Sequence, residues 1–114
     1  MNLGDYFAGM LRHLVTIQEE PSESTPDGAG GRTPDWTDVF TDYGNVGPLS
    51  GRESVFAAQL EAVTSHRVLL RWREGVDAGM RVQFGSRLFN IRSVINVDER
   101  DRWLVLFCDE GVAT

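Results

Sequence analysis

The hydrophobic positions in the middle of the chain first follow a helical pattern. Phe56, Leu60 and Val63 recur at helical spacing and predict one buried stripe. Ser50 stands three residues before Glu53, which is the spacing of a capping box, where each side chain accepts a hydrogen bond from the other residue's backbone amide. We therefore expect a mid-chain helix with Ser50 as its N-cap.

After this helix the period changes to two, the repeat of a β-strand. The apolar residues Val68, Leu70 and Trp72 alternate with residues expected on the opposite face, which are Arg67, Leu69, Arg71 and Arg73. One face of this strand should lie in the core. Two roles fit the three arginines: ion pairs on a solvated sheet face, or contacts with acidic groups of an adjacent subunit.

Five further segments have the alternation or the apolar density of strands, namely residues 11–20, 36–49, 80–84, 88–97 and 102–108. The segment 36–49 is expected to bend near Gly44 or Gly47. Gly85 and Ser86 suit a two-residue hairpin turn whose first position needs positive φ.

The last two predicted strands differ in the faces that they bury. Residues 88–97 should place Phe89, Ile91 and Ile95 on one side. Residues 102–108 are apolar on both faces, so this strand is expected to be covered on both sides, under the helix or a neighbouring subunit. At the N-terminus Leu3, Tyr6, Phe7 and Met10 fall at helical spacing in a piece too short to be stable alone, so it is either frayed or docked on a neighbour.

These segments give six strands and one helix in the order β-β-α-β-β-β-β. Short antiparallel strands remove their exposed edges by curling into a barrel. The sequence therefore predicts a mainly β fold: a small antiparallel β-barrel of about six strands with one mid-chain α-helix and a long loop between the first two strands. At 114 residues the chain fits a single domain, residues 1–114.

The long loop is residues 21–35, which hold three prolines and no large apolar side chain. We expect a flexible loop within the domain. A loop of this length is either functional or a floppy surface insertion. Its glycines lack the Lys-Ser/Thr pair of a phosphate-binding loop.

The formal net charge of −6 is concentrated around this loop. Between Glu19 and Asp42 there are seven acids and one base, whereas the rest of the chain is balanced. An acidic field repels nucleic-acid phosphates, which disfavours a DNA-reading module. Repulsion remains useful to a protein that DNA must slide past. No apolar run approaches the roughly 20 residues that span a membrane.

No group of residues has the spacing of a catalytic, metal or cofactor site, so we expect neither an enzyme nor a cofactor. Asp98, Glu99 and Asp101 are better explained as solvated turn charges than as a metal cluster. The single cysteine, Cys108, ends an apolar run and is expected to be a buried small hydrophobe. His13 is expected to be an edge residue with a hydrogen-bond partner, because no second histidine stands at ligand spacing.

Several short blocks stand in a specific order from about Gly9 onward: Leu11-Arg12-His13, Val15 to Gln18, Pro48 to Glu53, Ser65 to Val68, Arg71-Trp72-Arg73, Gly79 to Val82, Phe89 to Asn96 and Asp98-Glu99-Arg100. In this order the blocks resemble the tailed-bacteriophage head closure family, also called head-tail joining or stopper proteins. No single block would be specific enough.

The resemblance implies a structural virion protein with a small β-barrel. Proteins of this family assemble as a ring below the portal and its adaptor, retain packaged DNA and present the surface on which the tail docks. The expected partners are therefore other copies of the chain in a dodecamer or hexamer, the portal or adaptor, and tail proteins. Double-stranded DNA would pass through the lumen without sequence-specific binding. The free chain is expected to be a monomer in the host cytoplasm during assembly.

The resemblance also implies that the long loop closes the channel. The acids should avoid sticking to DNA, while the glycines permit a closed-to-open rearrangement. The residues that we assign to this gating loop and its ends are Glu19, Glu20, Glu23, Asp27, Gly28, Gly30, Gly31, Arg32, Asp35 and Asp38.

Two other functions also fit the sequence. One is a different connector protein, such as an adaptor or a tail-terminator protein, which would also assemble with other virion proteins. A small barrel argues against a mainly helical adaptor. A β-barrel that binds single-stranded nucleic acid would use Trp36, Trp72 and Trp103 as stacking platforms. The acidic balance of the chain weighs against that second function.

Overall fold

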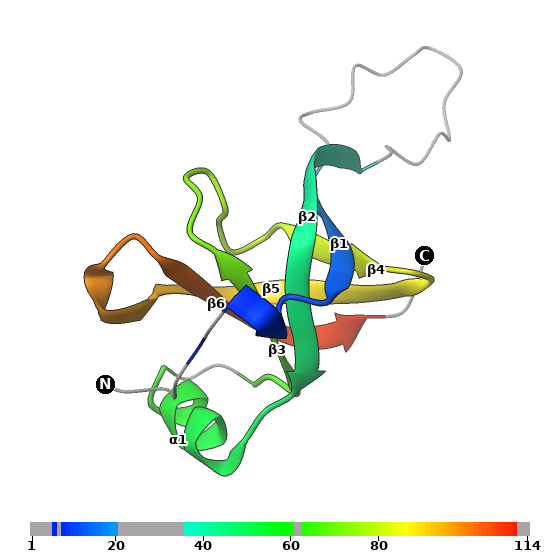
Figure 1. The fold of residues 1–114 in the computed structure, drawn as a ribbon. Coiled ribbons are helices and arrows are strands. Elements are labelled where there is room, and N and C mark those ends of the chain that lie inside the picture. The colour runs from blue at the N-terminus through cyan, green and yellow to red at the C-terminus, as the bar shows by residue number, and fades with distance from the viewer. Residues whose placement is uncertain (1–5, 7, 21–35, 61–62, 112–114) are drawn as a thin grey trace.

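The computed structural model describes residue 6 and residues 8–20, 36–60 and 63–111 (Figure 1). These residues contain two 3₁₀ turns, six strands and one α-helix. In chain order the elements are η1 (Ala8–Met10), β1 (His13–Glu19), β2 (Thr37–Pro48), α1 (Gly51–Gln59), β3 (His66–Arg71), β4 (Arg81–Phe84), β5 (Arg87–Asn96), η2 (Val97–Glu99) and β6 (Trp103–Gly111). The predicted element order is confirmed.

The six strands close into a barrel in the order β1-β2-β3-β6-β5-β4. Every neighbouring pair is antiparallel, including β1 with β4, the pair that joins the two ends of the sheet. The predicted fold class, a small antiparallel barrel with one mid-chain helix, is therefore confirmed. Because the sheet is closed, its strands have no free edge on which another strand could add. The predicted loop at 21–35 joins β1 to β2 and lies outside the described residues.

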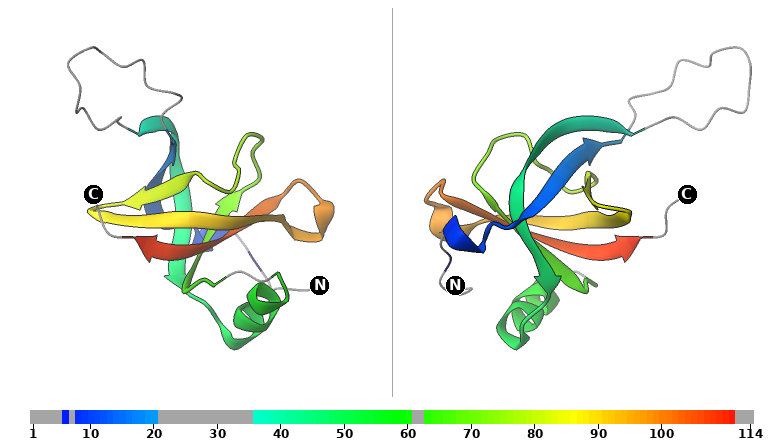
Figure 2. Two further views of the ribbon diagram at one scale, coloured as in Figure 1. Left: turned by 180° about the vertical axis from the view of Figure 1, so that it is seen from behind. Right: turned by 45° about the vertical axis from the view of Figure 1, so that its right-hand side comes forward.

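Strand β2 changes its partner at Gly44. Up to Gly44 its residues pair with β1, and from Asn45 onward they pair with β3. Figure 2 shows that β2 curves strongly along its length. A Cβ atom at Gly44 would stand 2.7 Å from the Leu69 carbonyl oxygen and 2.7 Å from Leu70 Cδ2. Glycine is required here because the neighbouring strand crosses too closely for any side chain.

Two apolar clusters lie on opposite faces of the sheet. The cluster inside the barrel consists of Val15, Ile17, Val68, Leu70, Val76, Val82, Phe89, Ile91, Leu104, Leu106 and Cys108. The cluster outside the barrel consists of Ala57, Leu69, Val97, Trp103, Val105 and Phe107, and we call it the outer cluster. The outer cluster is covered by partly buried residues of α1 and of the N-terminal segment, among them Tyr6, Met10, Leu11 and Phe56.

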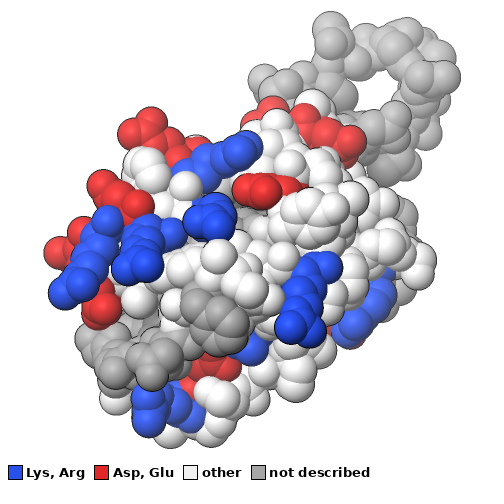
Figure 3. Space-filling view, in the orientation of Figure 1, with Lys and Arg blue, Asp and Glu red and all other residues white. Residues whose placement is uncertain are grey.

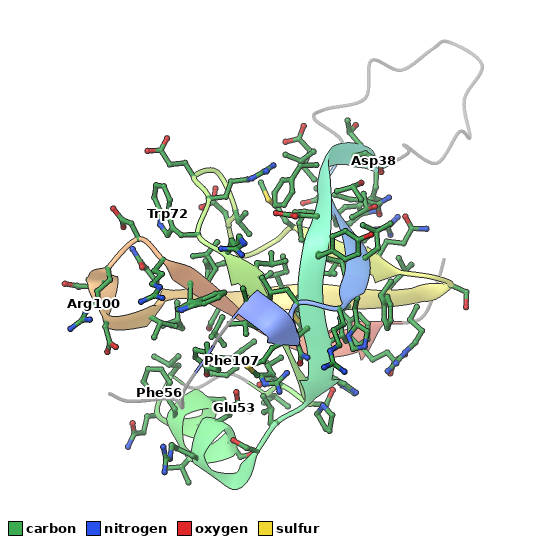
Figure 4. All side chains as sticks on the ribbon, viewed as in Figure 1. Asp38, Glu53, Phe56, Trp72, Arg100 and Phe107 are labelled. Atoms are coloured by element: carbon green, nitrogen blue, oxygen red, sulfur yellow. The ribbon has the colours of Figure 1, made fainter. Side chains whose placement is uncertain are left out.

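Strand β6 is buried on both faces, as its sequence predicts. All residues from Trp103 to Cys108 are buried. Alternate residues contribute to the inner and the outer cluster. The covering element is α1, whose Phe56 ring meets the Phe107 ring edge-on at a centroid distance of 5.9 Å (Figure 4). The N-terminal segment docks beside it, so a single chain covers this face without a second subunit.

The predicted stripe along the helix is wrong beyond Phe56. The helix α1 ends at Gln59, and the residues that it buries are Glu53 and Ala57. Leu60 is the C-cap and is exposed, and Val63 is 90% exposed. Helical spacing puts residues on one face only while the helix continues, so it does not apply to Val63 once α1 has ended.

Two strand faces also differ from the prediction. Leu69 was expected among exposed arginines, yet it is fully buried in the outer cluster because α1 and the N-terminal segment cover that side of β3. Ile95 was expected beside Phe89 and Ile91, yet it packs against the outer cluster. The cause is a register shift between Ile91 and Ser93, where β5 gains one residue over β6 and the alternation of faces inverts.

The two predicted turns are present. Gly85 has φ of +62° and begins the two-residue connection between Phe84 and Arg87, so this hairpin prediction is confirmed. Before β6, Asp98, Glu99 and Asp101 all have φ between 53° and 56°. Asp98, Glu99 and Asp101 are exposed turn residues, and Asn96 Nδ2 donates to Asp101 Oδ1 at 2.7 Å.

Replacing Gly44 with alanine tests the crossing of β2 over β3. The added methyl group must displace the backbone of Leu69, so Gly44→Ala should lower the free energy of unfolding by about 1–3 kcal/mol in urea denaturation. Gly51→Ala is the matched control, because a Cβ atom there meets nothing within 4 Å. Equal stability of the two variants would contradict the role given to Gly44.

Candidate assembly surfaces

Glu53 is a buried carboxylate that fixes α1 on the barrel. Its Oε1 accepts a hydrogen bond from the Ser50 amide at 2.8 Å, and its own amide donates to Ser50 Oγ at 3.1 Å. The predicted capping box is therefore confirmed. The second carboxylate oxygen, Oε2, lies 2.9 Å from Nε of Arg67 on β3. A helix cap and a barrel strand thus share one carboxylate.

Arg67 extends the connection from β3 to β2. Its Nη1 donates to Asn45 Oδ1 on β2 at 2.9 Å, and Asn45 Nδ2 donates to the Met10 carbonyl at 2.9 Å. The Arg67 side chain is only 18% exposed. Figure 4 shows Glu53 between the helix and the sheet. We name Glu53, Arg67 and Asn45 the brace, because they join α1, β3, β2 and the N-terminal segment.

Tyr6 joins the same group from the N-terminal side. Burial raises the pKa of its phenol, and the negative charge and hydrogen bond of Glu53 act in the same direction, so that the pKa is about 12. A phenol that stays protonated can donate to a carboxylate. The N-terminal segment is therefore held by apolar contacts with the outer cluster and by polar contacts with the brace.

The three arginines predicted for a subunit contact have different surroundings. Arg67 is engaged inside the chain, as described above. Arg71 and Arg73 are exposed, and neither forms an ion pair with a described residue. The Arg71 guanidinium lies 5.8 Å from the Trp103 ring centroid, and that of Arg73 lies 3.9 Å from the Phe40 ring centroid. Figure 3 shows arginine and acidic side chains interspersed on the side where η2 lies.

The ends of the acidic segment are joined by a second polar group. Gln18 on β1 is buried, donates to Asp38 Oδ1 at 2.8 Å and to Gln83 Oε1 at 3.2 Å, and accepts from Arg81 Nε at 2.6 Å. Arg81 also lies 4.3 Å from the ring centroid of Trp36, and burial lowers its pKa. We call Gln18, Asp38 and Arg81 the clamp. It joins β1, β2 and β4 where the chain leaves the barrel.

Only part of the predicted gating loop can be placed. Glu19 and Glu20 at the end of β1 are exposed, and Asp38 at the start of β2 belongs to the clamp. The other members lie outside the described residues: Glu23, Asp27, Gly28, Gly30, Gly31, Arg32 and Asp35.

The residues singled out for possible chemistry have structural partners. His13 Nδ1 accepts from the Val46 amide at 3.0 Å, as expected of an edge histidine with a partner. Cys108 is fully buried, and burial raises the pKa of its thiol. Within the described residues no three histidine, cysteine or acidic side chains are grouped so that they could hold a metal ion. No described helix is long and apolar enough to cross a membrane.

Two of these contacts could not be predicted from the sequence. The capping-box spacing predicts that Glu53 accepts from the Ser50 amide. It does not show that Arg67 binds the other oxygen of Glu53. Gln18 stands in one series with Leu14 and Thr16, which alternates with the apolar Val15 and Ile17, so the pattern predicts an exposed residue. It is buried because side chains of β2 and β4, namely Asp38, Arg81 and Gln83, cover it.

The fold and these surfaces define a small closed β-barrel with a helix braced on its outer face. Comparison of the sequence with protein families assigns it more closely: the chain belongs to the phage head completion protein family, whose model matches residues 7–111. The head completion protein gp16 of Bacillus phage SPP1 is 29% identical over 75 residues, which are 66% of this chain and 67% of gp16.

Two solved structures share the fold. Protein SF1141 from Shigella flexneri 2a has a TM-score of 0.66 and 23% identity, over 94% of this chain and 98% of that one. A chain in the virion of a native gene transfer agent particle has a TM-score of 0.57 and 21% identity, over 90% of this chain and 97% of that one. The family consists of structural phage proteins, which is not an enzyme class, and membership places this chain in the virion at the phage head.

Replacing Arg67 tests the brace. Arg67→Met keeps the length of the side chain but leaves the buried Glu53 carboxylate without its cation, so the free energy of unfolding should fall by about 3 kcal/mol. Urea denaturation monitored by tryptophan fluorescence measures the change.

The matched control is Arg71→Met, which removes an exposed arginine of the same strand and should change stability by less than about 0.5 kcal/mol. Adding Glu53→Gln to Arg67→Met should recover much of the loss, because glutamine can still cap the helix and leaves no buried charge. Equal destabilisation by Arg67→Met and Arg71→Met would show that the brace is not what holds α1.

Proposed function

We propose that the chain forms a ring of identical subunits, a dodecamer or a hexamer, below the portal and its adaptor. The ring closes the DNA exit channel after packaging and presents the surface on which the tail docks. The observation that carries this proposal is the match to the head completion family over residues 7–111. A protein that completes a filled head acts where the head still has an opening, which is the channel through which DNA entered.

The closed barrel supports assembly through surfaces other than strand edges. Identical subunits that meet head to tail form a ring whenever the rotation between them closes. We propose that Arg71 and Arg73 take part in this contact, since they are exposed and form no ion pair with a described residue. Acidic groups of the adjacent subunit would pair with them. The free chain is a monomer until it meets the portal complex.

The acidic segment between β1 and β2 is proposed to close the channel. The stretch from Glu19 to Asp42 holds seven acids and one base, so it repels DNA phosphates and lets the duplex slide past. The clamp supports this role because it fixes both ends of the segment to β4. The rest of the barrel surface is then available for contacts with neighbouring subunits and with the partners of the ring.

Deleting Ser22 to Thr33 separates channel closure from assembly. The deletion spares the clamp, so heads assembled with the shortened chain should carry the ring and accept tails. These heads should lose packaged DNA to nuclease. Heads that lack the chain altogether are the control and should both leak and fail to bind tails. Normal DNA retention by the deletion variant, in heads where microscopy shows the ring, would refute the gating role.

A module that binds single-stranded nucleic acid receives less support. Stacking platforms need exposed aromatic faces. Trp103 is only 8% exposed and packs in the outer cluster, and the Trp36 ring is covered by Arg81. An adaptor is likewise disfavoured, since the described residues contain one helix of nine residues among six strands.

A further inference from the structure

Two large apolar side chains stand side by side on the outer face of β1 and β2. Leu14 is 53% exposed and Tyr43 is 54% exposed. Leu14 alternates with Val15, which belongs to the cluster inside the barrel, so Leu14 points outward. It pairs directly with Tyr43, and opposite residues of two strands stand on the same side of the sheet. Exposed apolar side chains that lie together mark protein–protein contacts more often than single ones do.

No described element covers these two residues, which we call the Leu14–Tyr43 pair. The helix α1 packs on β6, and Figures 1 and 2 show α1 apart from β1 in each view. The N-terminal segment reaches β2 through Asn45, whose amide donates to the Met10 carbonyl at 2.9 Å. Neither member of the pair belongs to the inner or the outer cluster. Within the described chain the pair is therefore left in contact with water.

Arg12 places a positive charge at the border of the pair. It stands two residues before Leu14, and the alternation along this segment puts both side chains on the outer face. Its Nε donates to the Gly9 carbonyl at 3.1 Å, which limits the directions that the guanidinium can take. Arg12 is exposed and forms no ion pair with a described residue. The other nitrogens of the guanidinium are therefore available to an anion.

The acids of β1 and β2 do not neutralise this arginine. Asp42 precedes Tyr43, but it pairs with the inward-facing Val15, so its side chain starts on the other side of the sheet. One of its oxygens accepts from the Tyr43 amide at 2.8 Å. Farther along the strands, Thr16 and Thr41 share a hydrogen bond of 2.9 Å between their hydroxyl groups. The remaining acids of these strands lie at the clamp or beyond it.

This arrangement fits a partner that offers an apolar side chain next to a carboxylate. Tyrosine and arginine are enriched at the centres of protein–protein contacts. A carboxylate can accept two parallel hydrogen bonds from one guanidinium. We propose that the Leu14–Tyr43 pair and Arg12 form a docking face for an acidic, apolar segment of another virion protein. The inference rests on the proposed function and adds the chemistry of one partner.

A second copy of the chain is the weaker occupant of this face. The proposed contact between copies uses Arg71 and Arg73, so it leaves this face for a different protein. The acidic residues 21–35 of a copy hold no large apolar side chain that could bind the pair. Residues 60–63 of a copy combine Leu60 and Val63 with one acid. Crosslinking distinguishes this segment from that of another protein.

The test is photocrosslinking in assembled heads, with and without tails. The photoreactive residue p-benzoylphenylalanine replaces Leu14, and irradiation links it to the side chain that covers the pair. Mass spectrometry should identify a peptide of another virion protein with an aspartate or glutamate beside the linked residue. The free chain should stay uncrosslinked. The same photoreactive residue in place of Ser86, an exposed turn position between β4 and β5, is the matched control and should not link to that peptide.

Charge reversal at Arg12 tests the carboxylate of the partner. Arg12→Glu should lower the crosslink yield about tenfold, because like charges then meet in the contact. Arg12→Lys keeps the charge and should retain most of the yield. Arg52→Glu changes another exposed arginine, on α1, and should leave the yield unchanged. Urea denaturation of each variant shows that the barrel is folded.

A crosslink to a second copy of the chain, or to a peptide without an acid, would overturn the inference. An unchanged yield with Arg12→Glu would overturn it too, as would the absence of any crosslink in heads where microscopy shows the ring. These results leave the proposed function intact. Crosslinked heads that contain the chain without any ring would instead overturn the proposed function and leave the docking face in place.

Discussion

The pairing of the Glu53 carboxylate with Arg67 determines how the outer half of this protein is organised. A buried carboxylate is costly without a cation and further hydrogen bonds. Here one oxygen accepts from the Ser50 amide and the other meets Arg67, while Arg67 also reaches Asn45. Because these groups come from α1, β3 and β2, the position of the helix on the barrel is fixed by charge and hydrogen bonding as well as by apolar packing.

This constraint explains why a closed barrel carries a second apolar layer. The inner cluster is complete without the helix, whereas Leu69, Trp103, Val105 and Phe107 point away from it. These residues would be exposed to water if α1 and the N-terminal segment left, which would cost roughly 1.5–3 kcal/mol for each large side chain. The braced helix therefore belongs to the stable core of the subunit. The surfaces left for partners are the uncovered face of β1 and β2 and the outer side of α1.

The sequence predicts the barrel, the capping box and the strand buried on both faces, because each rests on a local pattern of residues. It misses the face of Ile95, since one added residue in β5 inverts the alternation of faces. It also misses the burial of Gln18, which polar side chains of β2 and β4 cover. It also misses the burial of Leu69 and does not identify Glu53 as the partner of Arg67, because both depend on where the helix packs on the sheet. Period-two alternation along a strand does not show which of its residues are buried by elements that are distant in the sequence.

We propose that this chain is a ring subunit at the DNA exit of the phage head. A cryo-electron microscopy reconstruction of the head opening in filled, tail-less particles tests it most directly. The account predicts a ring of barrels below the portal, each with α1 docked on β6 as it is here. Density for the chain elsewhere on the head, or single copies without a ring at the opening, would contradict it.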